Sequence, residues 1–244
     1  MQLSNEQLAM TIHTGCDLLA WFAAYAVGRF VQRRYLTSHP AAFDFSSHPH
    51  YFTALAIAAA VGALFFGTLN LALGSHAASE TFRLGHSSAG AIAGGIVGAE
   101  WYKWRHRIRQ STGLLFVAPL AAGLMVGRIG CFLTGLPDRT FGTPTDLPWG
   151  YDFGDGVLRH PVQLYESLAM ALFLVAFLIA LRRANAAVLA AGFYLFILFY
   201  AGQRFCWEFL KPYPTLLLDL NLFHLLLLAL IGYALAMLRA GRSQ

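Results

Sequence analysis

Four polar side chains recur at helical spacing inside one of the most apolar parts of the chain. They are Tyr200, Arg204, Glu208 and Lys211, which are separated by four, four and three residues. This spacing predicts that all four lie along one stripe of a single helix. An ionised group inside a lipid bilayer is costly unless it is paired or reached by water, so these residues are candidates for function rather than for packing.

Two further charged residues, Arg128 and Glu166, lie near the ends of other apolar stretches. We expect them at the same membrane face as Arg204 and Glu208, because each lies toward the outer end of its stretch. Two arginines that converge there would bind a phosphate group, since each guanidinium can hold two oxygens and stays charged. The alternative is structural: Arg204 and Glu208 neutralise each other along the helix, and Arg128 extends its charge to the lipid headgroups.

The histidines give weaker evidence of a functional role than these charged residues do. His86 precedes a glycine-rich stretch and would suit a base for a thiol or hydroxyl nucleophile, although a single histidine is more often structural. His160 and Gln163 are interpreted equally well as helix caps or as anchors of the preceding loop. His224 and Asp219 are expected to form polar packing pairs. The sequence shows no Ser-His-Asp order, phosphate-binding loop or His/Cys metal cluster, so we expect no metal and disfavour a self-contained hydrolase.

The elements that position these residues are predicted to be membrane helices. Hydrophobic residues make up 57% of the chain and charged residues 12%, against about 45–50% and about 25% in soluble domains. Apolar stretches of about 20 residues predict transmembrane helices. Five are clear: residues 51–73, 113–133, 162–181, 186–210 and 215–238. Two weaker ones, at 8–31 and at the glycine-rich 89–101, complete an all-α fold with about seven spans in a single domain over 1–244.

Lysine and arginine predict the orientation, because they are retained on the cytoplasmic side of a membrane. They gather in every second loop and at the end of the chain, as Arg33, Arg34, Lys103, Arg105, Arg107, Arg109, Arg182, Arg183, Arg239 and Arg242. The N-terminus is therefore expected in the periplasm and the C-terminus in the cytoplasm, with the protein in the inner membrane. The segment 134–160 then faces outward, and its turn-forming residues favour a lid or a substrate-docking element.

Three other classes of protein are disfavoured. The basic residues form short clusters rather than one face, which argues against binding to nucleic acid. Residues 1–15 contain no lysine or arginine, so no cleaved signal peptide is expected. Cys16 follows a short sequence that faintly resembles a lipoprotein cleavage box, but the apolar run that such a box needs does not precede it. The three cysteines are odd in number and show no metal-binding spacing.

Four segments of the chain resemble the prolipoprotein diacylglyceryl transferase family. They are GHSSAG at 85–90, GRIGCF at 127–132, RHPVQLYE at 159–166, and the series that begins at Tyr200. This family moves diacylglycerol from phosphatidylglycerol to the cysteine of a lipoprotein precursor and releases glycerol phosphate. The resemblance implies that Arg128 and Arg204 bind the phosphate of the lipid. It also implies that His86, Tyr200 and Glu208 shape the transfer site.

The resemblance implies a wider set of substrate-binding residues, namely Lys211, Arg159, His160, Gln163, Tyr165 and Glu166. No cofactor is implied, and the implied partners are phosphatidylglycerol, a prolipoprotein or other acceptor, and membrane lipid. The chain departs from the family pattern at Cys131, where asparagine is expected, at Lys211, where arginine is expected, and at the serine pair 87–88, where glycines are expected.

These departures leave three alternatives open. The first is a related transferase with a different acceptor, and the second is a non-catalytic protein that binds or flips phospholipid. The third is a small transporter, although the two halves of the chain show no self-similarity of the kind that inverted repeats produce.

Overall fold

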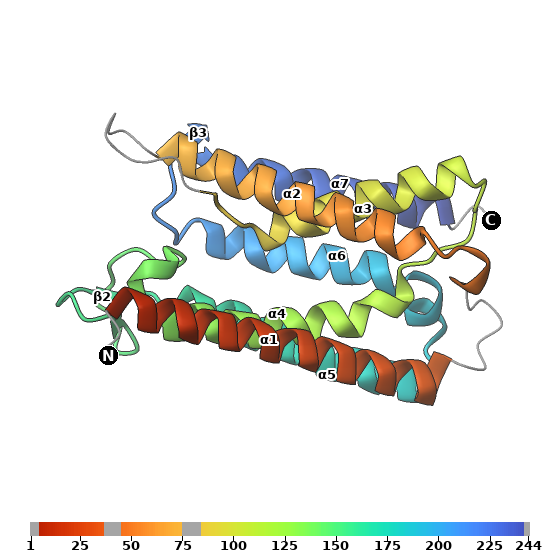
Figure 1. Cartoon of the computed structure of the whole chain (residues 1–244), viewed down its shortest axis with the longest axis horizontal. Helices are drawn as coiled ribbons and strands as arrows, with labels where there is room; N and C mark the ends of the chain where they lie inside the picture. The colour runs from red at the N-terminus through yellow and green to blue at the C-terminus, as the bar shows by residue number, and fades with distance from the viewer. Residues whose placement is uncertain (1–4, 37–44, 75–83, 242–244) are drawn as a thin grey trace. The chain divides into compact units, whose positions relative to one another are not determined.

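The structure, a computed structural model of the 244-residue chain, describes residues 5–36, 45–74 and 84–241. Within these residues there are seven α-helices, labelled in Figure 1: α1 (Asn5–Val31), α2 (Tyr51–Gly74), α3 (Ser88–Arg105), α4 (Leu114–Thr134), α5 (Val162–Arg182), α6 (Ala186–Glu208) and α7 (Leu222–Gly241). The short elements are a π-helical turn η1 (Gln32–Leu36), two 3-10 turns, η2 (Phe45–Ser47) and η3 (Leu136–Asp138), and strands β1 (Tyr151–Asp152), β2 (Leu158–Arg159), β3 (Thr215–Leu217) and β4 (Leu220–Asn221).

Five of these helices, α2, α4, α5, α6 and α7, are long and apolar enough to cross a membrane by length and composition. They correspond to the five clear spans predicted from the sequence, so the chain is a helical multi-pass membrane protein. Helices α1 and α3 form where the two weaker spans are predicted. That α1 and α3 also cross the membrane, and that the N-terminus lies outside, stay predictions.

The predicted span at 215–238 begins too early. Its first residues form an antiparallel β-hairpin of β3 and β4, and Asp219 in the turn has a positive φ of 61°. A residue with that backbone conformation cannot continue an α-helix. Helix α7 instead begins after Asn221, whose side chain accepts a hydrogen bond from the His224 N–H at 3.0 Å, while His224 Nδ1 accepts from the Asn221 N–H at 3.1 Å. Asp219 therefore lies outside the helix, and His224 has Asn221 as a hydrogen-bond partner.

The chain divides into two compact units. The first contains α1, α4, α5, α6 and the part of α7 from Tyr233 onward. In this unit α1 packs along α4, α4 packs along α5, and α5 contacts α6. Small residues make the α1–α4 contact close: Gly130 of α4 faces the Cys16 side chain, and a Cβ atom at position 130 would overlap it. The single transmembrane domain expected from the sequence stays a prediction.

The second unit contains α2, α3, the β3–β4 hairpin and the first part of α7. Helix α3 packs against α2 through the glycines of its first turns, because a Cβ atom at Gly94 would overlap the carbonyl oxygen of Ala58. The N-terminus of α3 is capped by Ser87, whose side chain accepts from the Gly90 N–H at 3.1 Å. Such a cap satisfies a backbone donor that the helix itself cannot.

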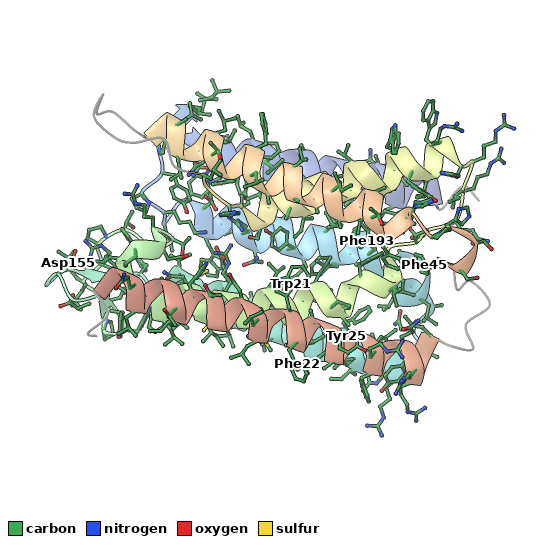
Figure 2. All side chains as sticks on the ribbon, in the orientation of Figure 1. Trp21, Phe22, Tyr25, Phe45, Asp155 and Phe193 are labelled. Carbon is green, nitrogen blue, oxygen red and sulfur yellow. The ribbon has the colours of Figure 1, made fainter. Side chains whose placement is uncertain are left out.

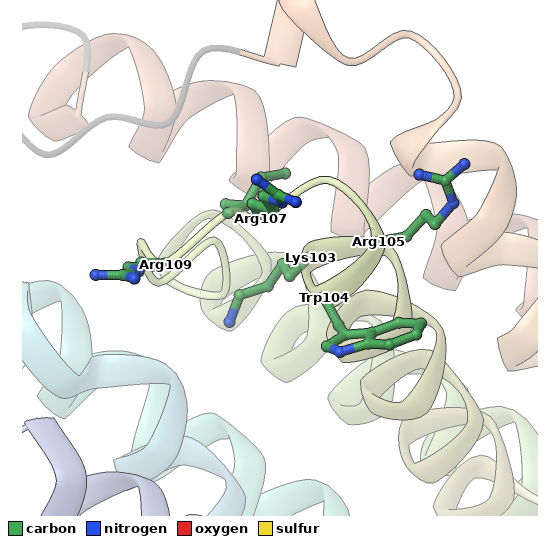
Figure 3. A pocket seen from close by; sticks show the side chains of 6 residues that line it. Lys103, Trp104, Arg105, Arg107 and Arg109 are labelled. Atoms are coloured by element: carbon green, nitrogen blue, oxygen red, sulfur yellow. The ribbon is translucent and has the colours of Figure 1, made fainter.

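Basic residues surround the end of α3 in the second unit. Figure 3 shows a surface hollow lined by Lys103, Trp104, Arg105, Arg107, Ile108 and Arg109. Lys103 is paired with Glu100 at 3.0 Å. The other basic side chains fit the predicted cytoplasmic loop, where such residues are enriched. Arg242, the last residue of the predicted basic set, lies outside the described residues.

The outward segment 134–160 has a defined structure. Strands β1 and β2 form an antiparallel hairpin, and the Asp152 carboxylate accepts hydrogen bonds from the N–H groups of three residues in its turn, at 2.8, 3.1 and 3.0 Å. The Thr143 N–H donates to the Leu210 carbonyl just beyond α6 at 2.6 Å. This segment is therefore fixed to the end of α6. Its role as a lid stays a prediction.

Helix α1 exposes an apolar face. Trp21, Phe22 and Tyr25, labelled in Figure 2, are 76%, 68% and 66% exposed. Large apolar side chains gathered on one face of a helix indicate contact with lipid or with another protein. This observation supports the prediction that α1 is a membrane span.

Candidate active site

Five charged side chains are buried together at one end of the first unit. Arg128 comes from the last turns of α4, Glu166 from the second turn of α5, Arg204 and Glu208 from the end of α6, and Lys211 from the turn that follows α6. Each is at most 8% exposed. Together they carry three positive charges and two negative charges, so the cluster has an excess of one positive charge.

Glu166 joins two of the cations. Its Oε2 pairs with Arg128 Nε, and its Oε1 accepts a hydrogen bond from Lys211 Nζ at 2.6 Å. Arg128 and Glu166 are far apart in sequence, but the packing of α4 along α5 brings them into contact. The alternative in which Arg128 extends to the lipid headgroups is wrong in this structure, because its side chain is buried and paired.

The predicted stripe is confirmed on α6 for Tyr200, Arg204 and Glu208, and the prediction that Lys211 continues it on the same helix is wrong. Arg204 Nη1 donates to the Tyr200 hydroxyl at 3.0 Å, and Arg204 Nε lies 3.5 Å from Glu208 Oε2. Lys211 lies past the end of the helix, yet its Nζ is 3.6 Å from the same carboxylate oxygen. Lys211 therefore joins the cluster from the turn after α6, and it reaches across to α5 through its hydrogen bond to Glu166.

Gln163 lies one turn before Glu166 on α5 and is 1% exposed. Neither its amide nitrogen nor its amide oxygen has a hydrogen-bond partner among the residues that the structure describes. A buried amide without a partner is uncommon in native proteins and needs an explanation. A substrate hydroxyl or phosphate oxygen would provide one.

The start of α5 holds the outward segment in place. The His160 N–H donates to the Thr143 carbonyl at 3.1 Å, and the His160 carbonyl accepts from the Gly142 N–H at 3.0 Å. The N-cap position of α5 is occupied by Pro161, not by His160. Of the two interpretations of His160, the hydrogen bonds therefore favour the loop anchor over the helix cap. A further hydrogen bond joins the outward segment to α5, in which Trp149 Nε1 donates to the Tyr165 hydroxyl at 2.8 Å.

Arg159 is paired within the outward segment. Its Nη1 and Nη2 donate to the Asp155 carboxylate at 2.6 and 2.8 Å, and its guanidinium lies 5.1 Å from the centre of the Phe141 ring. The hydrogen bond from Arg159 lowers the pKa of the Asp155 carboxyl, and the same bond raises the pKa of Arg159. A substrate-binding role for Arg159 stays a prediction, since it would require this pair to open or to be shared.

His86 belongs to the second unit. It directly precedes the Ser87 cap of α3, and its side chain is exposed. The preceding residue packs closely against α2, because a Cβ atom at Gly85 would overlap the backbone of Gly67. Its predicted role as a base stays a prediction.

A second group of side chains in the first unit was not predicted from the sequence. His13, Cys131 and Asp138 offer donor atoms that all lie within 4.8 Å of one another. The three residues are separated by long stretches of sequence, so no spacing pattern marks them. Only the contact between α1 and α4 brings them together.

Comparison with known proteins identifies the family. The chain matches the model of the prolipoprotein diacylglyceryl transferase family over residues 9–239. It belongs to this family. The resemblance seen in the four sequence segments is thereby confirmed, and the match extends well beyond those segments. No solved structure matches the chain.

Several curated relatives carry the name phosphatidylglycerol–prolipoprotein diacylglyceryl transferase. One from Cupriavidus pinatubonensis is 39% identical over 145 residues, which are 55% of this chain and 50% of the relative. One from Cupriavidus necator is 34% identical over 171 residues, 61% of each chain. One from Nitratidesulfovibrio vulgaris is 36% identical over 163 residues, 61% of this chain and 59% of the relative. The chain thus spans about half to three fifths of the length of these relatives.

Proposed function

We propose that this protein transfers the diacylglyceryl group of phosphatidylglycerol to the cysteine thiol of a lipoprotein precursor and releases glycerol phosphate. The buried cluster of three cations and two carboxylates carries this proposal. Its excess of one positive charge suits the single negative charge of a phosphodiester. Membership of the prolipoprotein diacylglyceryl transferase family supports the same substrates.

In the proposed reaction the acceptor thiolate attacks the glycerol carbon that bears the phosphate. A sulfur–carbon bond forms, the carbon–oxygen bond breaks, and the electron pair leaves with the phosphate. The thiolate and the diester bring one negative charge each, and the glycerol phosphate that departs carries both. Charge therefore grows on the phosphate in the transition state, where fixed hydrogen-bond donors stabilise it most.

Each residue of the cluster has a proposed role. Arg128 and Arg204 bind the phosphate oxygens, because a guanidinium can hold two oxygens with fixed geometry. Glu166 positions Arg128 and Lys211, Glu208 positions Arg204, and the Gln163 amide contacts a polar atom of the lipid headgroup. These assignments place the phosphate where α4, α5 and α6 meet.

The proposal also includes the topology and the acceptor side. Seven spans, with the N-terminus in the periplasm and the C-terminus in the cytoplasm, would place the cluster at the outer leaflet of the inner membrane. The lipoprotein cysteine would then approach from the periplasm past the outward segment, with His86 as the base that removes the thiol proton. The ordinary pKa of a thiol is about 8.5, so a base or a positive field is needed for the attack.

The test uses the purified full chain, phosphatidylglycerol and a peptide with a lipoprotein-type cysteine. We expect a thioether-linked diacylglyceryl peptide and free glycerol phosphate, and no product when serine replaces the cysteine. Arg128→Ala and Arg204→Ala should each abolish turnover. Arg182→Ala, which removes an exposed arginine at the other end of α5, is the matched control and should leave turnover unchanged.

Other results would favour the alternatives. Consumption of phosphatidylglycerol with a different acceptor would keep the donor chemistry and exclude the lipoprotein cysteine. Tight lipid binding without consumption with any acceptor would favour a lipid-binding or flipping protein. Full activity of both alanine variants would refute the phosphate role of the two arginines.

A further inference from the structure

The group His13, Cys131 and Asp138 lies beside the cation cluster in the first unit but takes no part in the proposed transfer. The imidazole comes from α1, the thiol from the end of α4, and the carboxylate from the turn η3 that follows. The donor atoms all lie within 4.8 Å of one another, and His13 Nδ1 is 3.8 Å from Asp138 Oδ1. All three residues are half-buried.

The fold brings these donors together through two close contacts. Gly130 allows α1 to approach α4, which places His13 over the turn of α4 that carries Cys131. Gly135, with a φ of 73°, ends α4 and reverses the chain, and the Asp138 N–H donates to the Gly135 carbonyl at 3.2 Å. Asp138 therefore folds back toward the helix that the chain has just left.

The donor set is that of a zinc site. Imidazole nitrogen, thiolate sulfur and carboxylate oxygen are the three kinds of ligand that Zn²⁺ uses in proteins. At bond lengths of about 2.0–2.3 Å, two ligands of a tetrahedral Zn²⁺ ion are about 3.3–3.8 Å apart. The upper end of this range belongs to two sulfur ligands, and nitrogen and oxygen ligands are about 3.3–3.5 Å apart. The distance of 3.8 Å between His13 Nδ1 and Asp138 Oδ1 is slightly longer than that. A shift of about 1 Å would bring the widest pair of the group into the same range.

The charges also balance. A neutral imidazole, a thiolate and a carboxylate carry two negative charges together, which equal the charge of a divalent cation. A neutral assembly of this kind suits a partly buried position, where an unpaired charge is costly. Arg128 Nη1 lies 4.0 Å from Cys131 Sγ, but the guanidinium charge of Arg128 is paired with Glu166.

Neighbouring groups would support a bound ion. His13 Nε2 lies 3.7 Å from Asp17 Oδ2, one turn further along α1, which is longer than a hydrogen bond. A closer approach of this carboxylate would give the usual partner of a metal-bound histidine. The Thr134 hydroxyl, now 3.3 Å from His13 Nδ1, would give up that contact to the ion. The Thr140 hydroxyl donates to Asp138 and steadies the carboxylate.

We propose that His13 Nδ1, Cys131 Sγ and a carboxylate oxygen of Asp138 bind a divalent zinc ion. Water is the fourth ligand. The Cys131 thiol loses its proton to solvent when the ion binds, since a metal ligand must be the thiolate. The ion links the start of α1 to the end of α4 and to the outward segment.

The test measures zinc binding by the purified full chain, by titration against a chromophoric chelator and by elemental analysis. We expect one Zn²⁺ per chain. Cys131→Ser, His13→Gln and Asp138→Asn should each weaken binding at least about tenfold, which is the smallest loss seen when a group around a metal is removed. Cys206→Ser and Asp146→Asn, which change an exposed thiol and an exposed carboxylate, are the matched controls and should bind zinc normally.

Two measurements on the unaltered chain keep the proposal testable even where a variant fails to fold. Co²⁺ in place of Zn²⁺ should give the intense visible bands of a tetrahedral ion and a thiolate-to-cobalt charge-transfer band. Zn²⁺ should also protect Cys131, and not Cys206, from a maleimide reagent, as read by peptide mass spectrometry.

Three results would overturn the proposal. One is the binding of much less than one zinc per chain, and another is equal labelling of Cys131 with and without zinc. The third is loss of binding in Cys131→Ser with unchanged binding in both His13→Gln and Asp138→Asn, since that would describe a single thiol rather than a three-ligand site.

Discussion

Glu166 is the carboxylate shared by Arg128 and Lys211, and replacing it with glutamine tests whether it positions the phosphate-binding arginine. The glutamine side chain has nearly the same shape but no charge. The cluster would change from three cations and two carboxylates to three cations and one, so its net charge would rise from +1 to +2. Two of the buried cations would lose their closest anion.

We expect this change to lower kcat more than it affects lipid binding. Misplacing a reacting group by about 1 Å can cost about 100-fold in rate, and we expect a fall in kcat of that size. KM for phosphatidylglycerol should stay the same or fall, because the greater positive charge favours an anion. Removing one partner of a buried ion pair costs about 3–5 kcal/mol, so the variant should also unfold at a lower temperature.

The assay is turnover of phosphatidylglycerol with the cysteine peptide, together with thermal unfolding of the purified protein. Glu100→Gln is the control for a second ion pair, since Glu100 pairs with Lys103 at 3.0 Å and its side chain is 37% exposed, although that of Lys103 is only 8% exposed. Because solvent reaches Glu100, its loss should lower the unfolding temperature less than the loss of Glu166 does, and turnover should be unchanged. Glu166→Asp keeps the charge and should recover part of kcat. The same kcat and the same unfolding temperature in Glu166→Gln as in Glu100→Gln would refute the positioning role.

Four further predictions follow from the same contacts. Arg204→Lys should lower kcat by about 100- to 1,000-fold, as the loss of a transition-state donor does, and a loss below tenfold would contradict this role. Lys211→Arg should preserve or raise turnover, whereas complete loss would mean that the pocket depends on an ammonium group. A reporter fused after Gln244 should be cytoplasmic, and a periplasmic signal would reverse the orientation. The pKa of Asp155 is lowered by Arg159, so this pair should stabilise the β1–β2 hairpin at neutral pH and lose that effect as pH falls through the lowered pKa. The protection factors of the amides in the hairpin turn, which correct the exchange rates for their intrinsic dependence on pH, should then fall in acid, and no difference from Asp155→Asn at neutral pH would contradict this prediction.

Hydrophobicity alone predicted most of the helices, because in a membrane protein the apolar stretch and the helix have nearly the same limits. It was wrong where an apolar stretch is not helical. The β3–β4 hairpin is richer in leucine than α7, with four leucines among residues 215–221 against eight among the twenty residues of α7. Its position is set by backbone conformation at Leu218 and Asp219, both with positive φ. A hydropathy window does not measure that property.

The candidate site was predictable where it depends on one helix and not where it depends on packing. The spacing of Tyr200, Arg204 and Glu208 predicted their contacts, because residues four apart on a helix are neighbours. The pairing of Arg128 with Glu166 depends on how α4 lies along α5. The position of each residue within its own apolar stretch does not show which residue of another helix it will contact. The zinc-ligand group was missed for the same reason, since His13 and Cys131 meet only through the α1–α4 contact.

The contacts of the two carboxylates in the cluster differ in a way that bears on the proposed reaction. Glu166 accepts from Lys211 at 2.6 Å and is paired with Arg128, whereas the Glu208 oxygen lies 3.5 Å from Arg204 and 3.6 Å from Lys211. The two distances from Glu208 are at or beyond the limit of a good hydrogen bond. Phosphate oxygens would therefore compete more easily for Arg204 than for Arg128. An interaction that becomes stronger as charge grows on the phosphate in the transition state raises the rate. An interaction of equal strength in the bound ground state and in the transition state only aids binding. We therefore expect the contact of Arg204 to strengthen most as the phosphate departs, while Arg128, held by Glu166, fixes the position of the phosphate relative to the attacking thiolate.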